Sequence, residues 1–112
     1  MGIDLVKRVY VLTARGTFSR DFGLRDQIRR ASVSIPTNIA EGFERSSRKE
    51  YLLFLNIAKG SAGEVRSLLR VAFDVGYLSQ SMYDKLREAT LVISRSLFNQ
   101  IQSIRAAPIR SP

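Results

Sequence analysis

The chain of 112 residues contains 18 Lys or Arg and 10 Asp or Glu, which gives a formal net charge of +8. It has no His, Cys or Trp, so disulfides, Cys- and His-based zinc sites, thiol nucleophiles and imidazole bases are excluded. Apolar residues make up 45% of the chain, enough for a core, and the length suits one domain. We therefore expect a folded basic domain with neither a metal nor a cofactor.

The positive charge is spread over the whole chain rather than gathered in a tail. Residues 1–56 hold 10 basic and 6 acidic side chains, and residues 57–112 hold 8 and 4. This distribution favours an anionic partner on the surface of the folded domain. The sequence has no signal-type start and no apolar run long enough to span a bilayer, so we expect a cytoplasmic location without membrane contact.

Apolar residues recur at intervals of three and four in four segments, which puts them on one side of a helix. The predicted helices cover residues 4–14, 22–43, 48–75 and 80–104. No segment alternates with a period of two, so we predict no sheet. Short connections make successive helices antiparallel, and the expected fold is an all-α, up-down-up-down four-helix bundle over residues 1–105. Residues 106–112 contain two prolines and are predicted to form a disordered tail.

Residue types at the segment ends agree with these boundaries. Gly16, Gly42 and Gly76 each fall where an apolar stripe ends, and glycine is favoured there because the residue after a helix often needs a positive φ. Ser47 opens a Ser-Arg-Lys-Glu capping box at the start of the third helix, and Ser79 is the expected cap of the fourth.

Pro36 lies inside the second predicted helix, where its ring removes one N–H and clashes with the carbonyl of Ser32. The helix either kinks there or divides into two pieces, with Pro36 in the first turn of the second piece. A kinked continuous helix is favoured, because Ala31, Ile35 and Ile39 keep one apolar face across the proline.

Polar side chains lie beside the apolar face of this helix. Asn38 and Glu41 are on neighbouring faces, and an unpaired buried polar group costs about 1–3 kcal/mol. Arg30 or Arg29 of the same helix, or a serine across the bundle, could supply partners. We interpret Arg30, Asn38 and Glu41 as a structural polar network that fixes helix register, with a ligand site as the alternative.

Several short motifs occur together in the second and third helices. Residues 27–31 read Gln-Ile-Arg-Arg-Ala, residues 34–36 Ser-Ile-Pro, residues 38–42 Asn-Ile-Ala-Glu-Gly, and residues 58–64 Ala-Lys-Gly-Ser-Ala-Gly-Glu. With these motifs, residues 4–104 resemble the bacterial 23S rRNA intervening-sequence proteins, also described as ribosomal-protein-S23-like. That family is similar to the accessory proteins of diversity-generating retroelements. The resemblance implies a four-helix bundle, a homopentamer and a role with nucleic acid, and it supplies no catalytic residues.

Gly60 and Gly63 lie inside the third predicted helix, where each glycine costs about 1 kcal/mol relative to alanine. That cost indicates close approach of another backbone, either within the bundle or from another subunit. The same helix carries a second apolar row at positions 54, 57, 61, 65 and 68. Two rows exceed what a single bundle face needs, which favours oligomerisation.

Basic side chains on the third helix and its entry turn are the best candidates for binding phosphate. Three share one stripe, predicted to lie opposite the apolar stripe, and three cluster at the turn before the helix. Phosphate binding needs mobile cations along a backbone and little else. The predicted contacts are the turn cations Arg45, Arg48 and Lys49 and the stripe cations Lys59, Arg66 and Arg70. An ordinary solvated surface is the alternative.

Two functions stay open on the sequence, and a third is disfavoured. The chain is expected to be a non-catalytic oligomer that binds RNA or DNA through the phosphate backbone. The alternative is a scaffold for a protein partner, with no nucleic-acid role. An enzyme is disfavoured because Glu41, Glu50 and Glu64 are the only reasonable acid–base candidates and no imidazole assists them.

Overall fold

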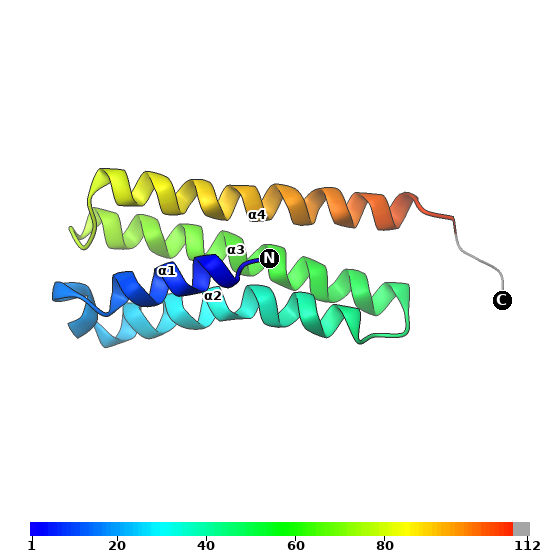
Figure 1. Ribbon diagram of the computed structural model, residues 1–112, viewed down its shortest axis with the longest axis horizontal. Helices are drawn as coiled ribbons and strands as arrows, with labels where there is room; N and C mark the ends of the chain where they lie inside the picture. Colours follow the sequence, from blue (N-terminus) through cyan, green and yellow to red (C-terminus); the bar gives the residue numbers. More distant parts are fainter. Residues whose placement is uncertain (109–112) are drawn as a thin grey trace.

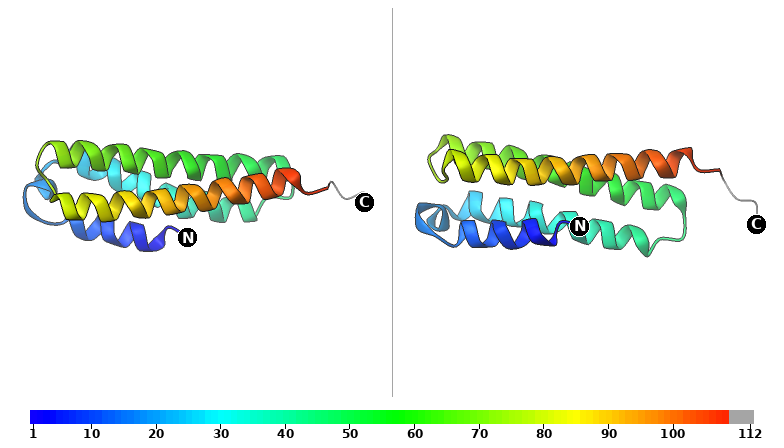
Figure 2. Two further views of the ribbon diagram at one scale, coloured as in Figure 1. Left: turned by 90° about the horizontal axis from the view of Figure 1, so that it is seen from above. Right: turned by 45° about the horizontal axis from the view of Figure 1, so that its top comes forward.

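Four α-helices and one short 3-10 helix make up the fold in the computed structural model, which describes residues 1–108 (Figure 1). Along the chain they are α1 (Ile3–Thr13), η1 (Gly16–Arg20), α2 (Phe22–Phe43), α3 (Arg48–Asp74) and α4 (Gln80–Ala106). Successive α-helices run antiparallel in an elongated bundle (Figures 1 and 2). The predicted all-α, up-down-up-down four-helix bundle is confirmed.

The predicted helix ends agree with the structure to within one or two residues. The sequence pattern predicts no element at η1, because its five residues are too few to show a hydrophobic period. Of the predicted tail 106–112, Ala106 is the last residue of α4, and residues 109–112 lie outside the described residues.

Side-chain caps and two glycines set the helix boundaries. Asp21, Ser47 and Ser79 each accept a hydrogen bond of 3.1 Å from the backbone N–H three residues later, at the starts of α2, α3 and α4. These bonds satisfy N–H groups that have no partner inside the helix. Gly16 and Gly76 have φ angles of +59° and +87°, as predicted for residues that follow a helix.

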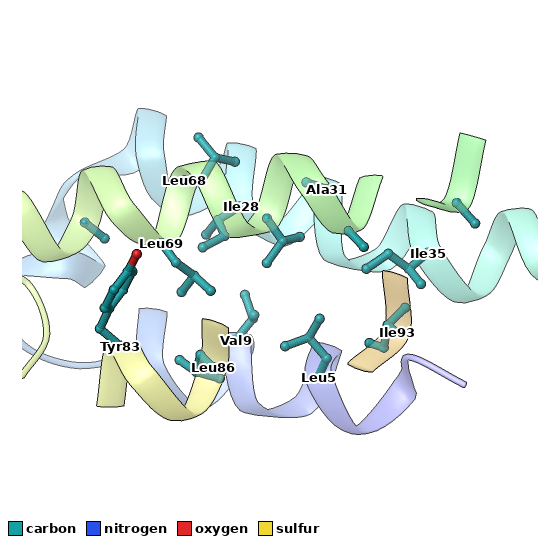
Figure 3. Packing of buried hydrophobic residues seen from close by; sticks show 14 of the residues in the cluster. Leu5, Val9, Ile28, Ala31, Ile35, Leu68, Leu69, Tyr83, Leu86 and Ile93 are labelled. Atoms are coloured by element: carbon teal, nitrogen blue, oxygen red, sulfur yellow. The ribbon is translucent and has the colours of Figure 1, made fainter. Parts of the chain in front are cut away.

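The core runs along the middle of the bundle between all four helices (Figure 3). The α3 helix lies between α2 and α4 and packs on both, whereas the short α1 covers only about half of the bundle's length (Figure 2). Each fully buried aliphatic side chain contributes about 1.5–3 kcal/mol. The largest fully buried apolar side chains are Phe18, Ile28, Ile35, Leu55, Leu69, Leu86, Leu97, Val9 and Val65.

The α2 helix runs without interruption through Pro36, so the predicted continuity is confirmed, and the kink stays a prediction. The start of α1 packs against it at this point: a Cβ placed on Gly2 would lie 2.9 Å from Ile35 Cγ2 and 3.3 Å from Pro36 Cδ. Gly2 also has a φ of +92°, a conformation that other residues rarely adopt. The segment around the proline is therefore a packing site for the N-terminus of α1.

The predicted reason for glycine at position 42, a positive φ after a helix, is wrong. Gly42 is buried inside α2, which continues to Phe43 and has its C-cap at Glu44. A Cβ at Gly42 would lie 2.9 Å from Tyr51 Cδ1 and 3.4 Å from Phe54 Cβ. Close packing of α3, and not a positive φ, is the reason for glycine here.

The second apolar row predicted on α3 packs largely within the bundle. Ser61, Val65 and Leu68 are buried and Phe54 is half-buried, whereas Ile57 keeps 41% of its surface exposed. Because α3 has two neighbouring helices, it needs two apolar rows, and the inference that the second row is surplus is wrong. An exposed apolar row lies on the far side of α3 and shares Ile57 with the second row; we call it the outer row: Leu53, Ile57, Val71 and Val75.

Gly60 and Gly63 are not pressed against another helix of the bundle, so a backbone contact within the bundle is wrong for both. Among the described residues, a Cβ on Gly60 would meet no atom within 4 Å. A Cβ on Gly63 would meet only the Arg66 side chain, at 3.6 Å. Gly60 follows Ile57 by three residues, which places it on the outer-row side of α3.

Candidate nucleic-acid interface

The stripe cations of α3 lie along the seam between α3 and α4. Lys59 Nζ is 5.5 Å from the centroid of the Phe98 ring, and Arg66 Nη1 donates a hydrogen bond of 3.3 Å to Ser94 Oγ. Lys59 and Arg66 are both half-buried. The prediction that this stripe lies opposite the apolar stripe is therefore wrong. Because α3 packs on two neighbours, its basic stripe falls at the edge of its contact with α4.

Arg70 continues the stripe toward the end of α3, with its charge partly neutralised. Its Nε is 3.1 Å from Asp74 Oδ2, and its guanidinium carbon is 6.0 Å from the centroid of the Tyr83 ring on α4. Both members of the ion pair are exposed, and such pairs contribute about 0–1 kcal/mol. A phosphate that displaced the Asp74 carboxylate from Arg70 would therefore lose at most about 1 kcal/mol of binding free energy to the broken ion pair.

The three turn cations lie in different surroundings. Arg45 Nη2 is 2.8 Å from Glu41 Oε2, so this charge is paired. Arg48 Nη2 donates a hydrogen bond to the carbonyl oxygen of Ile104 in the last turn of α4. A cation is stabilised there by the partial negative charge of the helix C-terminus. Lys49 is exposed to solvent.

One turn cation and the three stripe cations form a single line, which we call the seam row: Arg48, Lys59, Arg66 and Arg70. Their intervals along α3 correspond to about three, two and one helical turns, so the four side chains share one side of the helix. Each has a contact with a residue of α4. At 1.5 Å per residue the row extends over about 33 Å. Arg45 and Lys49 lie off it.

Very little negative charge opposes the seam row. Within residues 1–108, no carboxylate oxygen lies within 4 Å of the charged nitrogens of Arg48, Lys59 or Arg66. Arg70 alone in the row has such a partner, in Asp74. The row therefore carries three cations whose charges are not neutralised by neighbours of the described chain.

A shallow groove of about 430 Å³ lies beside the seam row on α4. Arg95 lines it and is a site residue that the sequence analysis missed. Its Nη2 is 3.0 Å from Glu88 Oε1, seven residues earlier and two turns away. The signal that could have identified it is its position next to Ser94, on the side of α4 that meets the stripe of α3. The lining residues are Lys59, Leu91, Ser94, Arg95, Phe98 and Asn99.

The predicted polar network forms with different members. Asn38 Nδ2 donates to the backbone oxygen and to Oγ of Ser34, each at 2.8 Å, and Ser34 Oγ is 2.8 Å from Ser61 Oγ on α3. A serine across the bundle is thus the partner. Glu41 is exposed and pairs with Arg45, and Arg30 is exposed, so neither belongs to the network. The network links α2 to α3, as expected of one that fixes their register.

The acidic side chains are dispersed over the surface. Glu41, Glu50 and Glu64 are all exposed. In the part of the chain that the structure describes, no group of three or more acidic residues is placed to hold a metal ion. None of the helices within residues 1–108 is both long and apolar enough to cross a bilayer.

The fold and the seam row together define a basic four-helix bundle protein. The chain belongs to the 23S rRNA-intervening sequence protein family, which matches residues 1–99, so the resemblance seen in the sequence is confirmed. Its fold is similar to the crystal structure of a protein of unknown function from the S23 ribosomal protein family of Bacteroides thetaiotaomicron VPI-5482. The TM-score is 0.83 and the identity 24%, over 90% of this chain and 94% of the other. Comparison with curated proteins gave no match.

Proposed function

We propose that the chain binds the phosphate backbone of RNA or DNA along the seam row, without catalysis and as an oligomer. The observation that carries this proposal is the line of Arg48, Lys59 and Arg66, three cations with no carboxylate within 4 Å in residues 1–108. The seam row extends over about 33 Å. One turn of a DNA duplex has nearly that length, about 34–36 Å, so successive phosphates along one groove edge are within reach.

The chemistry of the row supports backbone contact rather than base recognition. Its members are long cationic side chains at the edge of the packed pair α3 and α4. Contacts of this kind position a protein on nucleic acid without reading sequence. We therefore expect binding that weakens steeply with salt and depends little on base composition.

The test is a titration of fluorescent RNA and DNA duplexes of about two turns, read by anisotropy between about 50 and 200 mM salt. The wild-type protein is expected to lose affinity with a logarithmic slope near −3 per subunit bound, because about three phosphates are neutralised. The double variant Lys59→Glu, Arg66→Glu is expected to bind at least about tenfold more weakly and to reduce the slope by about 2. The milder double variant Lys59→Gln, Arg66→Gln is expected to lower the affinity and the slope in the same direction, and it disturbs packing less.

A matched control carries the same change in net charge on another part of the molecule. Arg20→Glu with Arg30→Glu alters two exposed residues of η1 and α2, outside the seam row. This control is expected to keep the wild-type slope. Equal losses in the two double variants would mean that net charge alone attracts nucleic acid and would contradict a binding surface at the seam. Absence of binding at the lowest salt would refute the proposal.

An oligomer would carry one seam row on each subunit and so would present several phosphate-binding rows at once. Each subunit brings a formal charge of +8 and one seam row. Simultaneous contacts by several rows raise the apparent affinity without any new kind of contact. The exposed apolar outer row of α3 is the surface that supports association between subunits.

The same outer row also supports the second candidate function, a scaffold for a protein partner. Leu53 and Val75 each leave more than half of their surface exposed at opposite ends of α3. A single protein partner recovered by affinity capture after nuclease treatment, together with no duplex binding at low salt, would favour the scaffold over the nucleic-acid proposal.

A further inference from the structure

A cleft of about 600 Å³ lies at the end of the bundle where α1, η1 and the start of α4 meet. Figure 2 shows α1 lying beside the first half of α4, at the end where η1 turns the chain into α2. One face of α1 and one face of α4 build the cleft, because positions 7, 8, 11 and 12 recur with the helical period and so do 82 and 85. Arg15 follows α1 in an extended conformation. Its lining residues are Lys7, Arg8, Val11, Leu12, Arg15, Gly16, Thr17, Tyr77, Met82 and Lys85.

The floor of the cleft is aliphatic. Val11 keeps 54% and Met82 40% of its surface exposed, and Leu12 between them and the core is half-buried. Tyr77 also lines the cleft and is held in place, since its hydroxyl donates a hydrogen bond of 2.8 Å to Asp21 and its ring centroid is 5.1 Å from that of Phe18. The floor is thus a fixed apolar surface that the described chain leaves uncovered.

The rim of the cleft is cationic. Four basic residues line it, three on or just after α1 and one on α4. Only Arg8 has a carboxylate within 4 Å in residues 1–108, at 3.9 Å from Asp4. Lys7, Arg15 and Lys85 therefore face a common space with their charges unopposed by the described chain. An anion placed between them would relieve their mutual repulsion.

We propose that this cleft binds a small anion with an aliphatic body, such as an acyl-chain carboxylate or an alkyl phosphate. The anionic head lies between the rim cations and the chain lies over Val11 and Met82. The volume is within the range of pockets for small molecules, about 300–1,000 Å³, and thioether side chains adapt readily to flexible chains. A nucleotide fits less well, because the one aromatic side chain of the lining, Tyr77, is already packed against Phe18. The cleft shares no lining residue with the seam row, so variants can alter either one without touching the other.

The test uses decanoate below its micelle concentration as the probe, with binding measured by calorimetry and by ¹H–¹⁵N chemical-shift mapping. Acetate supplies the head without the chain, and octyl glucoside supplies a chain without charge. We expect decanoate to bind and to shift the amides of residues 7–17, 77, 82 and 85, and both controls to bind at least about tenfold more weakly. Decyl phosphate in place of decanoate shows whether the site prefers one head group.

Two variants separate the site from general charge and from folding. Lys7→Glu with Lys85→Glu reverses two exposed rim charges and is expected to weaken decanoate binding at least about tenfold, the factor that one charge-assisted hydrogen bond represents. Met82→Gln is expected to weaken it through loss of apolar contact while the helix is kept. Arg30→Glu with Arg87→Glu reverses two exposed charges outside the cleft, is the control matched in net charge, and is expected to bind as the wild type does.

Three outcomes would overturn the proposal. The first is equal binding of octyl glucoside and decanoate, which would mean nonspecific apolar adsorption. The second is shifts confined to the outer row of α3. The third is flotation with phosphatidylglycerol vesicles without any shift by decanoate, which would assign the cationic rim to a membrane surface.

Discussion

Gly42 and Gly60 both lie inside helices, yet their surroundings differ completely. At Gly42 the backbone of α2 meets the Tyr51 ring so closely that a Cβ would lie 2.9 Å from Cδ1. The ring has little freedom to move away, because the Tyr51 hydroxyl accepts a hydrogen bond of 2.7 Å from Gln100 on α4. At Gly60 no atom of the described chain would contact a Cβ. The same residue type therefore serves packing at one position and has no role within the bundle at the other.

Replacing each glycine by alanine tests this difference. Gly60→Ala is expected to stabilise the subunit by about 0.5–1 kcal/mol, because alanine costs less than glycine in a helix. Gly42→Ala gains the same propensity but overpacks against Tyr51, at about 1–3 kcal/mol, and the expected net effect is a loss of up to about 2 kcal/mol. The measurement is urea unfolding by circular dichroism at one low protein concentration, with m unchanged. A Gly42→Ala variant that gains as much as Gly60→Ala would contradict the packing account.

At the scale of elements, Asp21 joins the start of α2 to the connection between α3 and α4. Its Oδ1 accepts from the backbone N–H of Leu24 at 3.1 Å, and its Oδ2 accepts from the Tyr77 hydroxyl at 2.8 Å. The hydrogen bond to the carboxylate favours the neutral phenol and raises the pKa of Tyr77 above its usual value of 10.0. One side chain thus caps a helix and ties together two connections that are distant in the sequence.

The hydrogen bond gives a pH-dependent contribution to stability whose sign follows from the raised pKa. A tyrosine whose pKa is higher in the folded state contributes fully below about pH 10, and the contribution is lost as pH rises through the folded-state pKa. Tyr77→Phe is therefore expected to unfold at a lower temperature than the wild type between about pH 7 and 9, with the difference shrinking above about pH 10. Thermal unfolding of both proteins over this range is the measurement. Equal unfolding temperatures between about pH 7 and 9 would show that packing of the ring on Phe18, which phenylalanine keeps, rather than the hydroxyl bond, stabilises this connection.

The helices themselves could be predicted because their determinants are local. Serine caps at Ser47 and Ser79 and the spacing of apolar residues placed the ends of α3 and α4 to within two residues. The reason for glycine at position 42 was wrong because a glycine at the end of an apolar stripe has the same local pattern whether it follows a helix or admits a neighbour. The two cases differ only in where Tyr51 lies, and that position depends on how the turn between α2 and α3 places α3 against α2.

The sequence identified most of the basic residues of the candidate site, but it did not predict where they lie relative to α4. The sequence identified Lys59 and Arg66 as candidate phosphate contacts, and the structure leaves both without a carboxylate within 4 Å in residues 1–108. Their place beside Phe98 and Ser94 depends on how far α4 is rotated around α3, which no single-helix pattern encodes. Arg48 lines up with the stripe cations for the same reason, because it donates its hydrogen bond to Ile104 in the last turn of α4.

At the scale of the whole molecule, the exposed apolar surface and the positive charge occupy different sides of α3. The seam row faces α4, whereas the outer row lies on the far side, with Ile57 and Val71 each more than 40% exposed. Association through the outer row would leave the seam rows of all subunits accessible to nucleic acid. The two features are therefore compatible in one particle, and each can be altered without the other.

This separation leads to a prediction about assembly. Wild-type protein is expected to scatter light as an oligomer, with a mass of about five times the 12.6 kDa subunit for a pentamer. Ile57→Lys places a charge in the outer row without disturbing the core and is expected to give a monomer that keeps its helical content. Duplex binding by this variant should weaken by about 10²-fold or more through loss of avidity, although its seam row is intact.

Val92→Lys, a similarly exposed position on α4, is the matched control and should remain oligomeric. A monomeric wild type, or an oligomer that survives Ile57→Lys, would exclude the outer row as the subunit interface.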